Sequence, residues 1–132
     1  MTAQAPLQAP IASAVVQKNT DRAAVALSLL CIAHCMVLPV AAIALPFLAA
    51  AAEAEWVHWV FAVLAVLASG SIVLFGHGSR TAAFLVPASS GIGLVVFGLF
   101  AEQFGIDEAI PTVIGGVLLA GAHGRRLLTL KR

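Results

Sequence analysis

The sequence predicts an all-α membrane protein, with four transmembrane helices in an up-down bundle and both termini in the cytoplasm. Of its 132 residues, 61% are hydrophobic and only 10% are charged, which leaves too little polar surface to cover a soluble globule. The apolar residues also fall into four long segments joined by short polar connections. The lipid bilayer is therefore the first partner that we expect for this chain.

The N-terminal residues 1–20 differ in composition from the rest of the chain. They are rich in Ala, Gln and Pro, and carry no charge before Lys18. No apolar segment with a cleavage site precedes the first long apolar segment, so we expect no cleaved signal peptide. We predict a disordered cytoplasmic tail over residues 1–20.

Four apolar segments follow this tail, and each reaches the ~20 residues that a helix needs to cross ~30 Å of hydrocarbon. Connections as short as those between them force neighbouring helices to run antiparallel. We expect a transmembrane domain over residues 21–128 and a basic cytoplasmic end over residues 129–132. The predicted spans are residues 23–50, 56–76, 82–101 and 110–128.

The charged residues give the predicted orientation. All 7 Lys and Arg residues map to one side of the predicted membrane plot, namely Lys18, Arg22, Arg80, Arg125, Arg126, Lys131 and Arg132. The connections on the other side carry Glu53, Glu55, Glu102, Asp107 and Glu108. Because basic residues favour the cytoplasmic side, both termini are expected there.

The first apolar segment contains the only two cysteines, Cys31 and Cys35, with His34 between them. Residues three and four apart share one face of a helix, so these three side chains are expected to point the same way. Thiolates and imidazole are the ligands that soft or borderline metals prefer. Pro39 cannot bond the Cys35 carbonyl, and such broken helices are tolerated beside cavities. The alternative interpretation is that the cysteines serve packing alone.

The three remaining histidines extend the set of candidate ligands. Counting ~1.5 Å per residue from Arg22 places Cys31 roughly 13 Å deep and His34 and Cys35 near the midplane. The same count places His58 near the outer surface, and His77 and His123 near the cytoplasmic surface. For each of these three residues, a solvated histidine at the membrane interface is an equal alternative to a metal ligand. The candidate metal ligands, from outside to inside, are His58, then Cys31, His34 and Cys35, then His77 and His123.

These motifs resemble those of the MerC-type mercury-resistance membrane proteins, over nearly everything from Asp21 to Arg126. The resemblance rests on Asp21, the segment Ser28-Leu-Leu-Cys31-Ile-Ala-His34-Cys35, Pro39, Pro46, His58, Gly76-His77, Gly115-Gly116 and Ala122-His123. The resemblance implies a multi-pass protein of the bacterial inner membrane that takes up mercuric ion, with the first-helix cysteines as its ligands.

The sequence departs from this family's best-known importers in two ways. Importers of that type have a Cys-x-x-Cys motif in the first helix, whereas three residues separate Cys31 from Cys35 in this sequence. They also carry a second cysteine pair in a cytoplasmic tail, and this chain has no further cysteine. Because added imidazoles suit zinc or copper(I), transport of one of these metals is the alternative.

The leading mechanistic hypothesis is thiolate ligand exchange, from a periplasmic metal-binding protein to a cytoplasmic thiol acceptor. His34 is a candidate proton acceptor for Cys35. No nucleotide-binding motif occurs, and we predict no enzyme activity, no permanently bound cofactor and no nucleic-acid partner. Three alternatives remain: a thiol oxidoreductase cycling a Cys31–Cys35 disulfide, a haem-binding bundle using His77 with His123, and a non-transporting accessory subunit.

Overall fold

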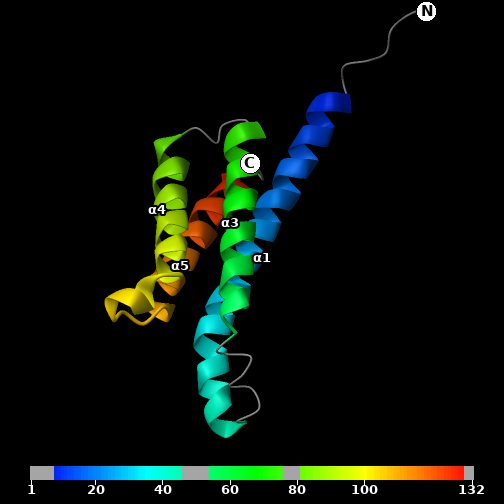
Figure 1. The fold of residues 1–132 in the computed structure, drawn as a ribbon. Coiled ribbons are helices and arrows are strands. Elements are labelled where there is room, and N and C mark those ends of the chain that lie inside the picture. Colours follow the sequence, from blue (N-terminus) through cyan, green and yellow to red (C-terminus); the bar gives the residue numbers. More distant parts are fainter. Residues whose placement is uncertain (1–7, 46–53, 76–80, 130–132) are drawn as a thin grey trace, which may run out of the picture.

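The protein is mostly helical over residues 8–45, 54–75 and 81–129, which are the residues that its structure, a computed structural model, describes (Figure 1). Within these ranges there is no β-strand. The elements are α1 (Gln8–Ala44), α3 (Glu55–Phe75), α4 (Ala82–Gly98), the short 3-10 helix η2 (Ala101–Phe104) and α5 (Ala109–Thr129).

Helix α1 is longer than the sequence predicted at its N-terminal end. Its 37 residues begin at Gln8, so the expectation of a disordered tail is wrong for residues 8–20. Adding residues to an existing helix needs no new nucleus, and Pro10 lies in the first turn, where an amide hydrogen is not required. At the other end α1 stops at Ala44, while residues 46–53, Pro46 included, lie outside the described ranges.

The other helices keep close to the predicted segments. Helix α3 covers 21 residues and α5 covers 21, whereas α4 covers 17 and ends at Gly98, before the predicted Ala101. The chain then turns through η2, which closes at Gly105 with a φ of 71°, a conformation that glycine adopts without strain. Asp107 Oδ1 accepts a hydrogen bond from the Ala109 amide at 2.8 Å and so caps the start of α5.

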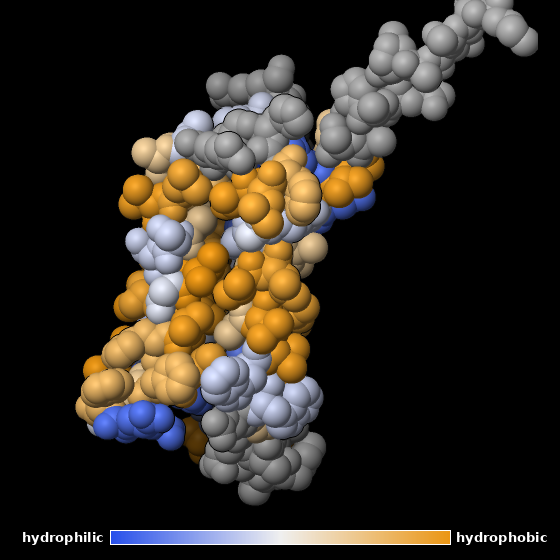
Figure 2. Space-filling model, turned by 45° about the horizontal axis from the view of Figure 1, so that its top comes forward, coloured by the Kyte–Doolittle hydropathy of each residue, from blue (hydrophilic) through white to orange (hydrophobic). Residues whose placement is uncertain are grey.

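Among the residues that the structure describes, two helices are long and apolar enough to cross a membrane, α1 over Ala14–Ala44 and α3 over Trp56–Phe75. Helix α4 is apolar but shorter. Large apolar side chains such as Val63, Leu67 and Val86 are exposed rather than buried, and Figure 2 shows apolar side chains covering most of the drawn face between the two ends of the molecule. This surface suits lipid rather than water, and the four-span arrangement itself stays a prediction.

Helix α5 packs closely against both α4 and α1. Glycines make these close approaches possible: a Cβ at Gly115 would lie 2.7 Å from the Gly91 carbonyl oxygen of α4, and a Cβ at Gly116 would lie 3.1 Å from Ile32 of α1. Small residues at helix contacts are the usual way in which helices approach in lipid. Helix α3 packs mainly on α1.

The bundle has two chemically different ends. The end that carries Lys18, Arg22 and Arg125, here called the basic end, joins the first half of α1 to the last turns of α5 (Figure 1). The end that carries Glu102, Asp107 and Glu108, here called the acidic end, joins η2 and the start of α5 to the start of α3. This separation agrees with the predicted charge pattern.

Candidate metal centre

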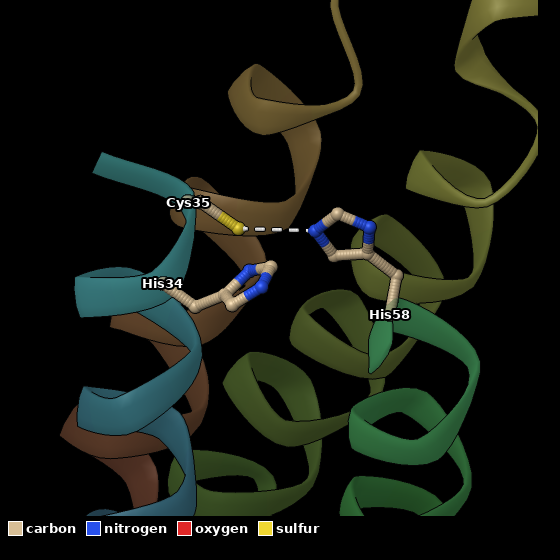
Figure 3. A group of neighbouring side chains, drawn as sticks. All are labelled: His34, Cys35 and His58. Atoms are coloured by element: carbon tan, nitrogen blue, oxygen red, sulfur yellow. Dashed lines mark hydrogen bonds between the residues drawn. The ribbon is translucent and has the colours of Figure 1, made fainter. Parts of the chain in front are cut away.

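Helices α1 and α3 bring together three side chains that can hold a metal ion. One ligand atom from each of His34, Cys35 and His58 lies within 4.8 Å of the other two. His34 and Cys35 project from adjacent positions of α1 and His58 projects toward them from the first turn of α3 (Figure 3). Cys35 Sγ lies 3.6 Å from His58 Nε2, and the two imidazole rings meet edge to face with centroids 5.1 Å apart.

This cluster opens onto a cavity of about 220 Å³ at the acidic end. Pro39 lies on its wall, and because proline has no amide hydrogen, the Cys35 carbonyl has no amide partner one turn later along α1. Helix α1 nevertheless continues through Pro39 to Ala44. The cavity is lined by His34, Cys35, Pro39, His58, Asp107, Glu108 and Ala109.

Glu108 lies beside the His58 ring, with its Oε1 at 3.3 Å from His58 Nδ1, an ion-pair distance. A carboxylate next to Nδ1 favours a proton on that nitrogen. His58 Nε2 faces the Cys35 thiol, 3.6 Å away. A carboxylate behind a histidine in this way is typical of metal-binding histidines.

Cys31 lies one turn of α1 away from this cluster, on the same buried face. Both cysteines are buried. On its other side Cys31 lines a smaller cavity, of about 20 Å³, that it shares with His123 and Ser69. Cys31 therefore lies between the metal-compatible cluster and the buried residues of the basic end.

His123 is not part of the cluster with His34, Cys35 and His58. It is fully buried near the basic end, where Nδ1 lies 2.8 Å from Asp21 Oδ1 and Nε2 lies 3.1 Å from Ser69 Oγ. His77, the remaining predicted ligand, lies outside the described residues. The structure thus brings together His34, Cys35 and His58, leaves Cys31 one turn away along α1, and places His123 separately.

The predicted order of depths needs one change. Residue counting placed His58 outside the cysteine cluster, but His58 lies beside Cys35. Helix α1 runs nine residues past Cys35, to Ala44, and so extends beyond the start of α3 (Figure 1). Counting along a single helix measures position on its own axis and does not give the offset between helices.

The sequence predicted no site role for Asp21 or Ser69, and it predicted Glu108 as a topology determinant or as a residue that gathers cations at the mouth. One signal was present for Asp21. The buried positions of α1 repeat at intervals of three and four, and the repeat joins the carboxylate to both thiols. The repeat consists of Asp21, Ala24, Ser28, Cys31 and Cys35.

Two imidazoles with one or two thiols form a soft donor set. Such a set binds thiophilic and borderline ions and lacks the oxygen-rich shell of magnesium or calcium sites. The cluster opens onto a cavity beside carboxylates, so a metal cation can approach it from the acidic end.

Comparison with known families matches residues 21–127 to the MerC mercury resistance proteins. No curated protein and no solved structure matches this chain. The match covers the four helices from Asp21 onward, with both cysteines, His34, His58 and His123. With its apolar helices, this chain is a membrane protein, and it belongs to the MerC mercury resistance family.

Proposed function

We propose that this protein carries mercuric ion inward across the bacterial inner membrane by exchange between thiolate and imidazole ligands. The observation that supports it most strongly is the convergence of His34, Cys35 and His58 to within 4.8 Å, in a chain of the MerC family. The proposed topology has four spans, with the basic end in the cytoplasm and the acidic end facing the periplasm.

The acidic end is suited to collecting a cation. Asp107 and Glu108 lie on the wall of the 220 Å³ cavity that leads to the cluster. Carboxylates in a low-dielectric cleft raise the local concentration of cations. A mercuric ion released by a periplasmic thiol donor would therefore meet these residues first, and Cys35 next.

Capture at Cys35 requires that the thiol lose its proton, because the thiolate is the ligand. His58 Nε2 is the base in contact with Cys35 Sγ, and Glu108 holds the other ring nitrogen. The S–H proton passes to Nε2 and then to water of the cavity, which frees Nε2 to bind the ion. His58 takes the role of proton acceptor that the sequence suggested for His34.

Cys31 is the next ligand inward. It lies one helical turn from Cys35 on the same buried face of α1, so the ion can exchange from one sulfur to the other without leaving the bundle. Thiol exchange proceeds through such mixed intermediates and needs no nucleotide. A soluble thiol on the cytoplasmic side would accept the ion at the end.

Zinc is the second candidate substrate. Zinc binds in tetrahedral sites to mixed sets of sulfur, nitrogen and oxygen ligands. The cluster offers such a set in Cys35, His34 and His58, with Glu108 nearby. A purely dithiolate clamp would favour mercuric ion more strongly. Parallel uptake assays with the two ions distinguish these substrates.

The test is accumulation of labelled mercuric ion in cells that produce this chain, compared with a Cys31→Ser/Cys35→Ser variant. The control is Ser89→Ala, a change at an exposed position of α4. Accumulation should fall to the background of cells lacking the protein in the double variant and stay unchanged in the control. Equal accumulation in both variants would rule out the thiolate mechanism.

A second arm separates transport from simple binding. The purified chain is placed in vesicles with glutathione inside, and mercuric or zinc ion is added outside. Time-dependent entry that depends on the cysteines supports transport. Stoichiometric binding without entry identifies an accessory metal-binding protein.

A further inference from the structure

A buried polar network joins three helices at the basic end. Asp21 of α1 and His123 of α5 are both 0% exposed. Asp21 Oδ1 accepts a hydrogen bond from His123 Nδ1 at 2.8 Å, and Oδ2 accepts one from Arg126 Nε at 3.2 Å. Ser69 of α3 completes the network at His123 Nε2, 3.1 Å away. Ionisable groups buried this deeply in a membrane protein are expensive to place and are functional candidates by default.

The network defines which nitrogen of His123 carries the proton. The Asp21 carboxylate only accepts, so His123 Nδ1 is protonated. Arg126 already balances the charge of Asp21, and a neutral ring keeps the buried group neutral overall. The lone pair of Nε2 therefore accepts the Ser69 hydroxyl proton. This is the second carboxylate-bound histidine of the bundle, after His58 with Glu108.

The Nε2 side of His123 lies on the wall of an internal cavity. The cavity measures about 20 Å³, enough for a single water molecule or an ion. Ser69 and Cys31 lie on the same wall, and most of the remaining lining is apolar. Cys31 lies one turn of α1 from Cys35 of the outer cluster and on the same buried face, so it lies between the two sites.

We propose that Cys31 Sγ and His123 Nε2 form a second, inner pair of ligands for the thiophilic ion, in the small cavity between α1, α3 and α5. Asp21 is the positioning residue that holds the ring, and Ser69 occupies Nε2 when no ion is present. This inner site rests on the proposed function, because its ion arrives from the outer cluster. It extends that function by giving the ion a second binding site between the outer cluster and the basic end.

The transfer is an exchange of ligands with no change of oxidation state. The bond from the ion to Cys31 sulfur is retained, the bonds to Cys35 sulfur and to His58 break, and a bond to His123 Nε2 forms. The Ser69 hydroxyl gives up its hydrogen bond to Nε2. The Cys31 thiol loses its proton when its sulfur binds the ion, and the departing Cys35 thiolate takes up that proton, which resets Cys35 for the next ion.

The test uses the full chain in lipid nanodiscs, labelled with nitrogen-15 at histidine and titrated with mercuric chloride while the ring-nitrogen resonances are followed. Mercuric ion should move the His123 Nε2 resonance and leave its Nδ1 proton in place. Ser69→Ala removes the hydrogen bond that competes with the ion for His123 Nε2. The mercuric ion concentration at the midpoint of the His123 titration should therefore fall about fivefold. Asp21→Asn should raise that concentration about tenfold, the usual effect of losing a carboxylate behind a ligand.

The matched control is Ser71→Ala, which removes a hydroxyl of α3 that bonds the Ala68 carbonyl instead and should leave the titration unchanged. A His123 Nε2 resonance that never moves, while the His58 resonance does, would overturn the inner site and leave the proposed function standing. If no histidine resonance responds and the cysteine variant takes up mercuric ion normally, the proposed function itself fails.

Discussion

Asp21 Oδ1 lies 2.8 Å from His123 Nδ1, although the two residues are 102 positions apart in the chain. The contact ties α1 to the last turns of α5, and it repeats the arrangement of Glu108 with His58 at the opposite end of the bundle. In both pairs a carboxylate lies beside one ring nitrogen, and the other ring nitrogen faces a thiol or a hydroxyl. Two oriented histidines thus lie on either side of Cys31 along the interior of the bundle.

The outer pair gives the first prediction. Glu108→Gln keeps the size of the side chain but removes the charge that orients His58, so the affinity of the outer cluster for mercuric ion should fall about 10- to 100-fold. Isothermal titration of the purified protein in detergent measures this directly.

Glu102→Gln is the matched control. Glu102 is exposed on η2, and its substitution removes an equal charge from the acidic end. Its affinity should stay close to that of the native protein. Equal losses in the two variants would show that the total charge of the acidic end matters and that the His58 contact does not.

The helix contact at Gly115 gives a second prediction. A methyl group there would lie 2.7 Å from the Gly91 carbonyl oxygen and 2.9 Å from a Val95 methyl carbon. Gly115→Ala should therefore separate α5 from α4 and lower the free energy of unfolding by about 1–3 kcal/mol. Gly121→Ala, where nothing lies within 4 Å, should not destabilise the protein. Thermal unfolding in lipid nanodiscs compares them, and a stable Gly115→Ala variant would contradict this packing.

A third prediction concerns the accessibility of the two thiols. Cys35 lines the larger cavity at the acidic end, whereas Cys31 lines the small internal one. A membrane-impermeant maleimide added to intact cells should label the Cys31→Ala variant, in which Cys35 remains, faster than the Cys35→Ala variant. Mercuric ion added first should protect Cys35. Faster labelling of Cys31 would reverse the proposed direction of entry.

The sequence predicted the helical class, the positions of the helices to within a few residues in most cases, and the shared face of the cysteines. It did so because apolar length, helical spacing and charge asymmetry are local properties of the chain. The pairing of Cys35 with His58, and of Asp21 with His123, depends on how far each helix slides along its neighbour. That offset follows from side-chain contacts such as those of Gly115 with Gly91, which spacing along one helix does not encode.

Arg126 gives the last prediction. Its guanidinium lies 5.2 Å from the centre of the Phe84 ring and its Nε is bonded to the fully buried Asp21. Arg126→Met would leave this carboxylate with His123 as its remaining partner. Removing one partner of a buried ion pair typically costs about 3–5 kcal/mol. The free energy of unfolding should therefore fall by about that amount, and the unfolding temperature should fall with it.

The exposed neighbour Arg125 is the control, because Arg125→Met removes the same charge from the same helix without touching Asp21. A combined Asp21→Asn/Arg126→Met variant should regain part of the lost stability, since neither charge is then left alone in the interior. Thermal unfolding of the four proteins in nanodiscs separates the two contributions. If Arg126→Met unfolds at the same temperature as Arg125→Met, the Asp21–Arg126 contact does not stabilise the bundle. The basic end would then be held together by the Asp21–His123 hydrogen bond and by apolar packing.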